Sequence, residues 1–411
     1  MSQQDYVSQY KEYIMPTYNP QKIVFERGHG CFLYDYDGNK YLDFIAGVAV
    51  NSLGYGHPKL VSQIEAQIHK LIHVSNLFII KEQGILAKTL CDKFGRGKAF
   101  FCNSGAEAIE GAIKLARKYG KKTLGQNSYE IITMKKSFHG RTLAAITATG
   151  QEKYQKDLEP LPAGFFYAEF GNIASIRDLV SEKTCAILIE PVQGEGGINV
   201  ATKEFWLSLA QLCEEKQILL ILDEIQTGIG RTGTFFAHEH YGIKPDVICL
   251  AKGLGGGYPI GAIIAKDPVA NCFQPGDHAS TFGGNPLACG SASAVISIIE
   301  EEDIVGNVIK MESVICAATR EYKQKFPFIK DIRGIGLMWG IELDSSIDCA
   351  GIVINALSKG LLINCIGGNI IRIAPPLIIG EQELLDGFSV LEQIFITLNN
   401  GKESDLLCMK T

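Results

Sequence analysis

The sequence predicts an α/β protein with a large domain built on a mostly parallel β-sheet and a smaller α/β domain. The chain has 411 residues, which is too long for one small module. Hydrophobic residues make up 46% and charged residues 20%, an ordinary globular composition. Through the middle of the chain, short apolar runs alternate with helical stretches, as in a parallel sheet covered by helices.

The first part of the chain predicts an arm, a hairpin and helices. Residues 1–20 are polar and rich in tyrosine, which suggests an entry arm or a short helix. Apolar and polar residues alternate around Asp37 and Gly38, which predicts a β-hairpin or meander. From about 59 to 93, apolar residues such as Leu60, Ile64 and Ile68 recur at helical spacing.

Six apolar runs in the middle of the chain predict the strands of the large sheet. These runs are AFFC (99–102), EIITM (130–134), CAILIE (185–190), ILLILD (218–223), DVICLA (246–251) and GAIIA (261–265). A long helix is expected at about 287–302, and a second α/β region follows residue 305. We therefore expect an arm and part of the small domain in 1–58, the large α/β domain in 59–305, and the rest of the small domain in 306–411.

Charge and cysteine use restrict the partners and the compartment. Lys and Arg total 39 against 45 Asp and Glu, a balance of −6 that argues against a nucleic-acid surface. We find no membrane span and no secretory signal, so we expect no membrane partner. The 12 cysteines form no C-x-x-C motif and are interpreted as buried thiols in a reducing cytoplasm. The H-E-H at 238–240 has no evident third ligand, so no metal site is expected.

Polar residues follow several predicted strands, where ligands bind in open α/β sheets. Ser104, in NSGAEA, looks like the N-cap of a helix, and Glu107 would complete a capping box. The free N–H groups of such a helix start suit a phosphate, although a simple capped helix would look the same. Asp223 closes an apolar strand, where a carboxylate needs a partner or a function; an N-cap or ion pair is the alternative.

Two further segments carry an amine, an aromatic ring and a guanidinium. Lys252 follows a buried strand and precedes several glycines; a desolvated lysine can form a Schiff base, although a loop lysine is the simpler interpretation. The spacing fits neither a dinucleotide-binding nor a Walker motif. In SFHGRT, Phe138 can stack on a flat ring and Arg141 can hold a carboxylate. His139 is interpreted as a structural imidazole without a chemical role.

Together, these four segments offer a phosphate cradle, a ring stacker, a carboxylate for a pyridine nitrogen and a lysine amine. Pyridoxal 5'-phosphate (PLP) enzymes need these parts, because the lysine forms a Schiff base and the acid keeps the ring nitrogen protonated. The combination is far more specific than any of its members.

Nearly the whole chain resembles a class III (subgroup II) aminotransferase. The family motifs stand in order as NSGAEA, SFHGRT, EPVQGEGG, DEIQTGIGRTG, LAKGLGGGYPIGA and STFGGNPLAC. Within that class the chain is most similar to the branch that acts on acetylornithine, through VAVNSLGYGHP, VSNLF and FAHEHYGIKPD. One departure is Ile109, where many members have Asn; it concerns a helix interior.

The resemblance implies a PLP fold type I aminotransferase that acts as a homodimer with shared active sites. Lys252 would hold PLP and shuttle the proton, Asp223 would pair with the pyridine nitrogen, and Gln226 would lie near the phenolic oxygen. The remaining implied cofactor contacts are Ser104, Gly105 and Ala106 for the phosphate, Phe138 for the ring, and Thr281 of the other subunit for the phosphate.

The resemblance also implies how two different substrates are accepted. Arg141 would bind a substrate carboxylate, and Ser280 would reach the substrate from the other subunit. Arg372 would bind the α-carboxylate of glutamate, while Glu195 would neutralise Arg372 when a terminal amine is bound. An unmatched arginine beside an amine substrate is unfavourable, which gives this switch a physical motive. A structural ion pair is the alternative for Glu195 and Arg372.

The implied reaction transfers the terminal amino group of N-acetylornithine to 2-oxoglutarate, giving N-acetylglutamate semialdehyde and glutamate, a step of arginine biosynthesis. Another ω-aminotransferase, acting on ornithine, succinyl-diaminopimelate or 4-aminobutyrate, would share every motif. A PLP mutase or racemase of the same fold is a further alternative, and a glutamate semialdehyde mutase would need no external keto acid. A binding protein without activity is remote, because Lys252 and Asp223 are both intact.

Overall fold

The structure, a computed structural model, describes residues 2–408, so Met1 and residues 409–411 of the predicted outer segments lie outside it. Its largest sheet has seven strands in the order β4-β12-β11-β10-β7-β5-β6. Only β12 runs antiparallel to its neighbours, so the predicted mostly parallel sheet is confirmed. The strands are β4 (Lys98–Cys102), β5 (Glu130–Met134), β6 (Phe165–Ala168), β7 (Thr184–Ile189), β10 (Leu219–Asp223), β11 (Val247–Leu250) and β12 (Gly261–Ala265).

Six of these strands coincide with the six predicted apolar runs, and β6 was missed. β6 lies at the sheet edge and pairs only with β5. Three of its four residues are exposed or half-buried, so its sequence FFYA does not form the long apolar run of a strand buried on both faces. The strands at the centre of the sheet, β7, β10 and β11, are buried at every position.

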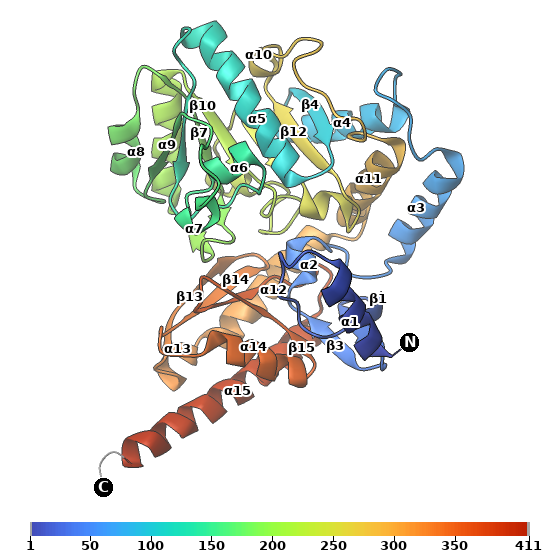
Figure 1. Ribbon diagram of the computed structural model, residues 1–411, viewed down its shortest axis with the longest axis vertical. Helices are drawn as coiled ribbons and strands as arrows, with labels where there is room; N and C mark the ends of the chain where they lie inside the picture. The colour runs from blue at the N-terminus through green and yellow to red at the C-terminus, as the bar shows by residue number, and fades with distance from the viewer. Residues whose placement is uncertain (1, 409–411) are drawn as a thin grey trace.

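Helices cover the large sheet, and one predicted helical stretch is divided (Figure 1). The pattern from 59 to 93 forms α3 (Pro58–Lys70) and α4 (Lys81–Phe94), which are separated by a non-helical segment, 71–80. The predicted long helix is α11 (Pro286–Glu301), capped by Asn285. The other helical elements of this region are α5 (Gly105–Tyr119), η1 (Gly120–Leu124), α6 (Leu143–Ala148), α7 (Glu152–Gln155), α8 (Ile173–Leu179), α9 (Lys203–Lys216), η2 (Ala237–Tyr241), η3 (Lys252–Gly255) and α10 (Asp267–Ala270), with a small sheet of β8 (Val192–Gln193) and β9 (Asn199–Val200).

Elements from both ends of the chain lie together in the lower part of Figure 1. β15, from the last quarter of the sequence, pairs in parallel with β3 and completes the sheet β1-β2-β3-β15. A further sheet has the order β13-β14-β17-β16. On this arrangement we propose the domain limits 1–58, 59–305 and 306–411 that the sequence suggested.

The remaining elements include the hairpin that the sequence predicted. β2 and β3 pair antiparallel around Asp37 and Gly38, so the predicted hairpin is confirmed. The elements are α1 (Gln3–Tyr13), β1 (Phe25–His29), β2 (Phe32–Asp35), β3 (Lys40–Asp43), α2 (Ala46–Ala49), α12 (Ile304–Thr319), α13 (Tyr322–Lys325), β13 (Ile329–Ile335), β14 (Met338–Leu343), α14 (Cys349–Ser358), β15 (Leu361–Leu362), β16 (Asn364–Ile366), β17 (Ile370–Ile373) and α15 (Glu381–Cys408).

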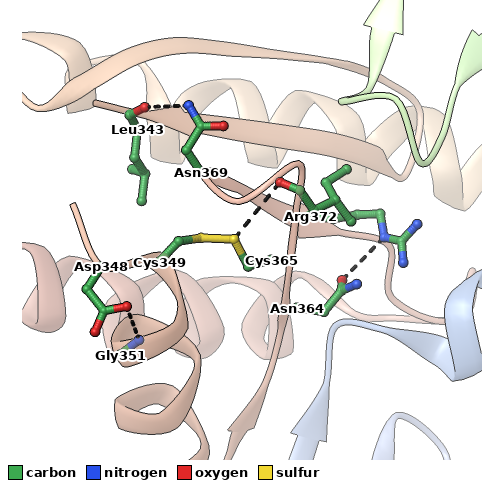
Figure 2. Close-up of a disulfide and its surroundings, with 9 residues drawn as sticks. Leu343, Asp348, Cys349, Gly351, Asn364, Cys365, Asn369 and Arg372 are labelled. Atoms are coloured by element: carbon green, nitrogen blue, oxygen red, sulfur yellow. Dashed lines mark hydrogen bonds between the residues drawn. A yellow bond between two sulfur atoms is a disulfide. The ribbon is translucent and has the colours of Figure 1, made fainter. Parts of the chain in front are cut away.

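The cysteines differ in two respects from the expected buried thiols, because two form a disulfide and two of the free ones are not buried. Cys349, at the start of α14, forms a disulfide with Cys365 of β16, with Cα atoms 6.2 Å apart (Figure 2). The turn of the chain from α14 into β16 brings together two residues that are 16 positions apart. Seven of the nine free cysteines described are buried, whereas Cys91 is half-buried and Cys316 is exposed. In the described part of the chain, no helix is long and apolar enough to cross a membrane.

Candidate active site

A cavity of about 420 Å³ lies at the carboxyl ends of the large-sheet strands. It is the place where ligands bind in open α/β sheets. Eight of the twelve predicted site residues line it: Ser104, Gly105, Ala106, Phe138, Arg141, Asp223, Gln226 and Lys252. The structure therefore brings together four segments that are far apart in the sequence.

The start of α5 offers backbone donors to this cavity. Ser104 is the N-cap, and its hydroxyl accepts a hydrogen bond from Glu107 N at 3.2 Å. The predicted capping box is only half formed, because Glu107 accepts from the backbone N–H of Asn103 instead of that of Ser104. The N–H groups of Gly105 and Ala106 have no acceptor among the described residues. Unpaired donors at a helix N-terminus are a favourable site for a phosphate.

Lys252 places its amine in the same cavity. It lies two residues after β11 and opens the short helix η3 with a left-handed backbone, φ 43°. Such a conformation costs a non-glycine residue roughly 1–3 kcal/mol and persists where the surroundings fix it, often at functional sites. Burial lowers the pKa of Lys252 to about 8; Glu195, Asp223 and Glu190 counteract this effect, and Arg372 adds to it. A larger neutral fraction makes the amine a better nucleophile.

Asp223 ends β10 and is held by two groups. Its Oδ1 accepts a hydrogen bond from Ile225 N at 3.1 Å, and its Oδ2 lies 2.7 Å from Nδ1 of His139. Both side chains are buried, and His139 is further fixed by a hydrogen bond from its backbone N to the Thr149 hydroxyl. With an ionised Asp223, Nδ1 is the protonated nitrogen of His139. The imidazole thus orients a carboxylate that can pair with a protonated ring nitrogen.

Glu190 follows β7 and is a second buried carboxyl group in the cavity wall. Its two oxygens accept from the backbone N–H groups of Phe138 and Gly194, both at 3.2 Å. Burial and the neighbouring Asp223 raise the pKa of Glu190 well above its usual range, in spite of these hydrogen bonds. Because Glu190 holds the backbone of Phe138, it helps to fix the loop that carries the aromatic ring.

Phe138 and Arg141 lie on the loop after β5. Phe138 packs edge-on against Tyr154, with ring centroids 5.9 Å apart. The guanidinium of Arg141 lies over the Tyr154 ring at 3.9 Å, and over the Phe138 ring at 5.4 Å. In the described part of the chain, Arg141 pairs with no carboxylate, and it is exposed at the cavity. Its charge is therefore available for an anionic ligand.

Glu195 and Arg372 form an ion pair beside the cavity. Arg372, in β17, is 2% exposed, and its Nη1 also donates to Oε1 of Gln226 at 3.4 Å. Burial raises the pKa of Glu195, but the charges of Arg372 and Lys252 outweigh burial and lower it overall. Gln226, which lines the cavity, therefore links the ion pair to the other site residues.

Ser280 and Thr281 do not line the cavity of their own chain. The hydroxyl of Ser280 accepts from Asn103 Nδ2 at 3.2 Å and from Gly283 N at 2.9 Å, so it lies near the cavity rim. Thr281 is exposed. Thr281 is thus on the surface, where another molecule can contact it, and Ser280 beside it is half-buried.

Sequence reasoning missed two residues of this site. Glu190 ends an apolar run, CAILIE, in the same way that Asp223 ends ILLILD, so the signal that found Asp223 was also present there. His139 was interpreted as a structural imidazole, and only the structure reveals its contact with Asp223. No group of three or more potential metal ligands occurs in the described part of the chain. In the H-E-H segment, which forms the helix η2, His238 instead contacts Glu224.

Comparison with known proteins gives a consistent result. The family model for class-III aminotransferases matches residues 13–395. The acetylornithine aminotransferase of Caldanaerobacter subterraneus subsp. tengcongensis is 50% identical over 93% of this chain and 97% of its own length. The acetylornithine aminotransferase of Methanocaldococcus jannaschii is 47% identical over 96% and 99%.

Solved structures of aminotransferases have the same fold as this chain. The ornithine aminotransferase from Toxoplasma gondii ME49 superposes with a TM-score of 0.94 at 31% identity, covering 98% of this chain and 96% of that one. The acetylornithine aminotransferase from Elizabethkingia anophelis has a TM-score of 0.86 at 32% identity, covering 97% and 100%. The family match, the high identity and the shared fold agree over nearly the whole length, and the chain belongs to the class-III aminotransferases.

Proposed function

We propose that this protein transfers the terminal amino group of N-acetylornithine to 2-oxoglutarate, giving N-acetylglutamate semialdehyde and glutamate. The observation that carries this proposal is the presence of two arginines near Lys252. Arg141 has no carboxylate partner among the described residues, and Arg372 is neutralised by Glu195. N-acetylornithine carries one carboxylate, whereas 2-oxoglutarate and its product glutamate carry two. The acetylornithine aminotransferases that share 43–50% of their sequence with this chain support the same reaction.

The cofactor of this family is PLP, and several residues that line the cavity are of the types that would suit it. The N–H groups of Gly105 and Ala106 would hold its phosphate, Phe138 would cover its ring, and Asp223 would pair with its ring nitrogen. Bound PLP supplies an aldehyde that condenses with amines and a ring that accepts electrons from the carbon next to the nitrogen. Gln226 would lie near its phenolic oxygen.

Lys252 would act as both the anchor of the cofactor and the proton carrier. Its amine would hold the cofactor aldehyde until a substrate amine replaces it. Once released, Nζ of Lys252 would take a proton from the substrate carbon that bears the amino nitrogen. It would then deliver this proton to the carbon on the other side of that nitrogen. A pKa of about 8 suits this task, since general bases work best near the ambient pH.

The two arginines would distinguish the half-reactions. Arg141 would bind the carboxylate that both kinds of substrate carry, on the accessible side of the cavity. During the amine half-reaction, Glu195 would remain paired with Arg372, because an uncompensated buried charge is costly. During the second half-reaction, the extra carboxylate of glutamate or 2-oxoglutarate would replace Glu195 as the partner of Arg372.

We further propose that two copies of the chain form a homodimer with shared sites. The segment before α4 exposes Leu77, Phe78 and Ile79, with exposed fractions of 86%, 69% and 101%. Asn76 ties this segment to the loop of Ser280 by hydrogen bonds to two main-chain oxygens, at 3.1 and 3.0 Å. A second copy that covers this apolar surface would receive Thr281 in its own cavity.

Mixing inactive variants tests the shared site. A Lys252→Ala dimer mixed with a Thr281→Glu dimer should regain activity after subunit exchange, because one site of the hybrid is intact. Lys252→Ala mixed with Asp223→Asn is the control and should stay inactive, since both residues belong to the same chain's cavity. Failure of the first mixture, with exchange shown by mass spectrometry, would contradict the shared site.

A half-reaction panel tests the proposed substrate. The holoenzyme is mixed in turn with N-acetylornithine, ornithine, N-succinyl-diaminopimelate and 4-aminobutyrate, and the cofactor absorbance is followed without a keto acid. We expect N-acetylornithine to react fastest. Ornithine is the second candidate, because solved ornithine aminotransferases share the fold with TM-scores up to 0.94. A faster reaction with ornithine would replace our proposal with that one.

The compartment is proposed as the cytoplasm. Nine cysteines in the described part of the chain are free thiols, and seven of them are buried. Free thiols are common in the reducing cytoplasm, where disulfides are the exception.

A further inference from the structure

The guanidinium of Arg372 already uses two of its nitrogens. Nη1 donates to Glu195 and Gln226, and Nε donates to Oδ1 of Asn364 at 3.3 Å. In the described part of the chain, no acceptor is bonded to Nη2. A carboxylate can bind a guanidinium by two parallel hydrogen bonds, either at the Nη1–Nη2 end or at the Nε–Nη2 side. Asn364 occupies the Nε–Nη2 side of the guanidinium. A carboxylate that displaces Glu195 can therefore bind only at the Nη1–Nη2 end.

The backbone holds Asn364 in this position. β16 and β17 pair antiparallel, and Asn364 stands directly opposite Arg372. The next residue, Cys365, is bonded to Cys349 of α14, so β16 is attached both to its partner strand and to a helix. Figure 2 shows the Asn364 amide turned toward the guanidinium, with the disulfide to the left of both. These attachments leave Asn364 little freedom to follow a displaced Arg372.

We propose that Asn364 is a positioning residue that sets the plane of the Arg372 guanidinium and directs its Nη1–Nη2 end to the substrate carboxylate. This inference rests on the proposed function, in which Arg372 binds the carboxylate that distinguishes glutamate and 2-oxoglutarate from the amine substrate. Asn364 thereby contributes to specificity without touching the reacting atoms.

The chemistry of the amide suits this task. An amide oxygen is a neutral acceptor, so it orients the guanidinium without cancelling its charge. A carboxylate at the same place would form a permanent ion pair and compete with the substrate. Asparagine therefore leaves the positive charge of Arg372 for Glu195 in one half-reaction and for the dicarboxylate in the other.

Three variants of the full-length holoenzyme test the proposal. Asn364→Ala removes the acceptor, and Asn364→Asp keeps the shape but adds a charge. Asn369→Ala is the matched control: Asn369 lies in the same hairpin, and its side chain donates to the Leu343 carbonyl at 2.9 Å, away from Arg372. The readouts are the two half-reactions, measured separately by stopped flow, and the equilibrium binding of glutarate by titration calorimetry. Glutarate is a five-carbon dicarboxylate that cannot react.

For Asn364→Ala we expect about a tenfold weaker binding of 2-oxoglutarate and glutarate, the usual effect of losing one hydrogen bond to a charged group. N-acetylornithine should change by less than about twofold, within the range of a minor surface effect. Asn364→Asp should weaken the dicarboxylates more than Asn364→Ala does. A purely structural role would give the opposite order, since aspartate preserves the packing.

Arg372→Ala separates this inference from the proposed function. If Arg372→Ala and Asn364→Ala both weaken the dicarboxylates only, the inference holds. If Arg372→Ala weakens them and Asn364→Ala does not, Asn364 has no positioning role. If Arg372→Ala has no effect on them, the proposed function of Arg372 is wrong and the inference fails with it. The inference would also be overturned if Asn364→Ala slowed both half-reactions equally. The same holds if the control Asn369→Ala weakened the dicarboxylates as much as Asn364→Ala does.

Discussion

The titration of Lys252 in the cofactor-free protein is the most direct test of the site electrostatics. Burial lowers the pKa of this amine to about 8 from an ordinary value of 10.5. That difference corresponds to about 3 kcal/mol of preference for the neutral form. At pH 7 the neutral fraction is then about 9%, against about 0.03% for an ordinary lysine, a gain of roughly 300-fold.

Competitive labelling of the cofactor-free protein with acetic anhydride measures this fraction. The reaction of Lys252 is followed by mass spectrometry of its peptide from pH 6 to 11, and the exposed Lys203 reports the reactivity of the reagent in the same sample. We expect half-maximal labelling of Lys252 near pH 8. Labelling that continues to rise to pH 10 or above would show that burial does not control this amine.

Variants of the charged residues around Lys252 should shift its labelling midpoint in opposite directions. Arg372 lowers the pKa of Lys252 and Glu195 raises it. Arg372→Ala should therefore move the labelling midpoint to higher pH, and Glu195→Gln should move it to lower pH. Midpoints that move together in the same direction would refute the assigned electrostatic roles.

Three further predictions concern the site, and a fourth concerns the stability of the fold. Lys252→Ala should retain PLP but lose transamination by more than the roughly 10²–10⁴-fold effect of a general base, and borohydride should label Lys252 alone in the wild type; a label elsewhere would refute the assignment. Asp223→Asn should slow the chemical step most, so unchanged single-turnover rates would exclude its role with the ring nitrogen. Arg372→Ala should weaken 2-oxoglutarate by about tenfold or more and spare N-acetylornithine, while Glu195→Gln should weaken the amine substrate and leave glutamate binding unchanged or improved; stopped-flow measurements of each half-reaction would contradict this if both halves fell equally. Arg231→Ala should lower the free energy of unfolding by about 2–5 kcal/mol in urea, because the buried guanidinium donates to two main-chain carbonyls at 3.0 and 2.5 Å; a loss below about 1 kcal/mol would contradict this.

Local patterns determined much of the fold. Six strands of the large sheet were predicted because central strands are buried on both faces and therefore read as continuous apolar runs. β6 was not predicted, because a partly exposed edge strand lacks a continuous apolar run. The helical period predicted helices at 59–93, but it could not locate the break at 71–80, which is itself rich in apolar residues. Five of them are exposed instead of packed on a helix face: Leu71, Ile72, Leu77, Phe78 and Ile79.

The sequence also predicted where the chemistry would lie. Asp223 ends a strand, and Lys252, Ser104 and Phe138 follow strands. The carboxyl ends of parallel strands meet at one edge of a sheet, so these residues were expected to converge. All four line one cavity. The strands of a sheet run mostly parallel where strands and helices alternate along the chain, so the local pattern already implies that these strand ends meet.

Only the tertiary structure decided which side chains touch. His139 contacts Asp223 across 84 positions of sequence, and Arg372 contacts Glu195 across 177. The disulfide partner of Cys349 was equally invisible in the sequence. Such contacts depend on strand order and on how the chain ends pack together, which local residue patterns do not encode. The sequence by itself determined six of the seven strands of the large sheet, most of the site residues at their ends and the family. The three-dimensional packing determined the hydrogen bonds and ion pairs that set the charges and orientations of these residues.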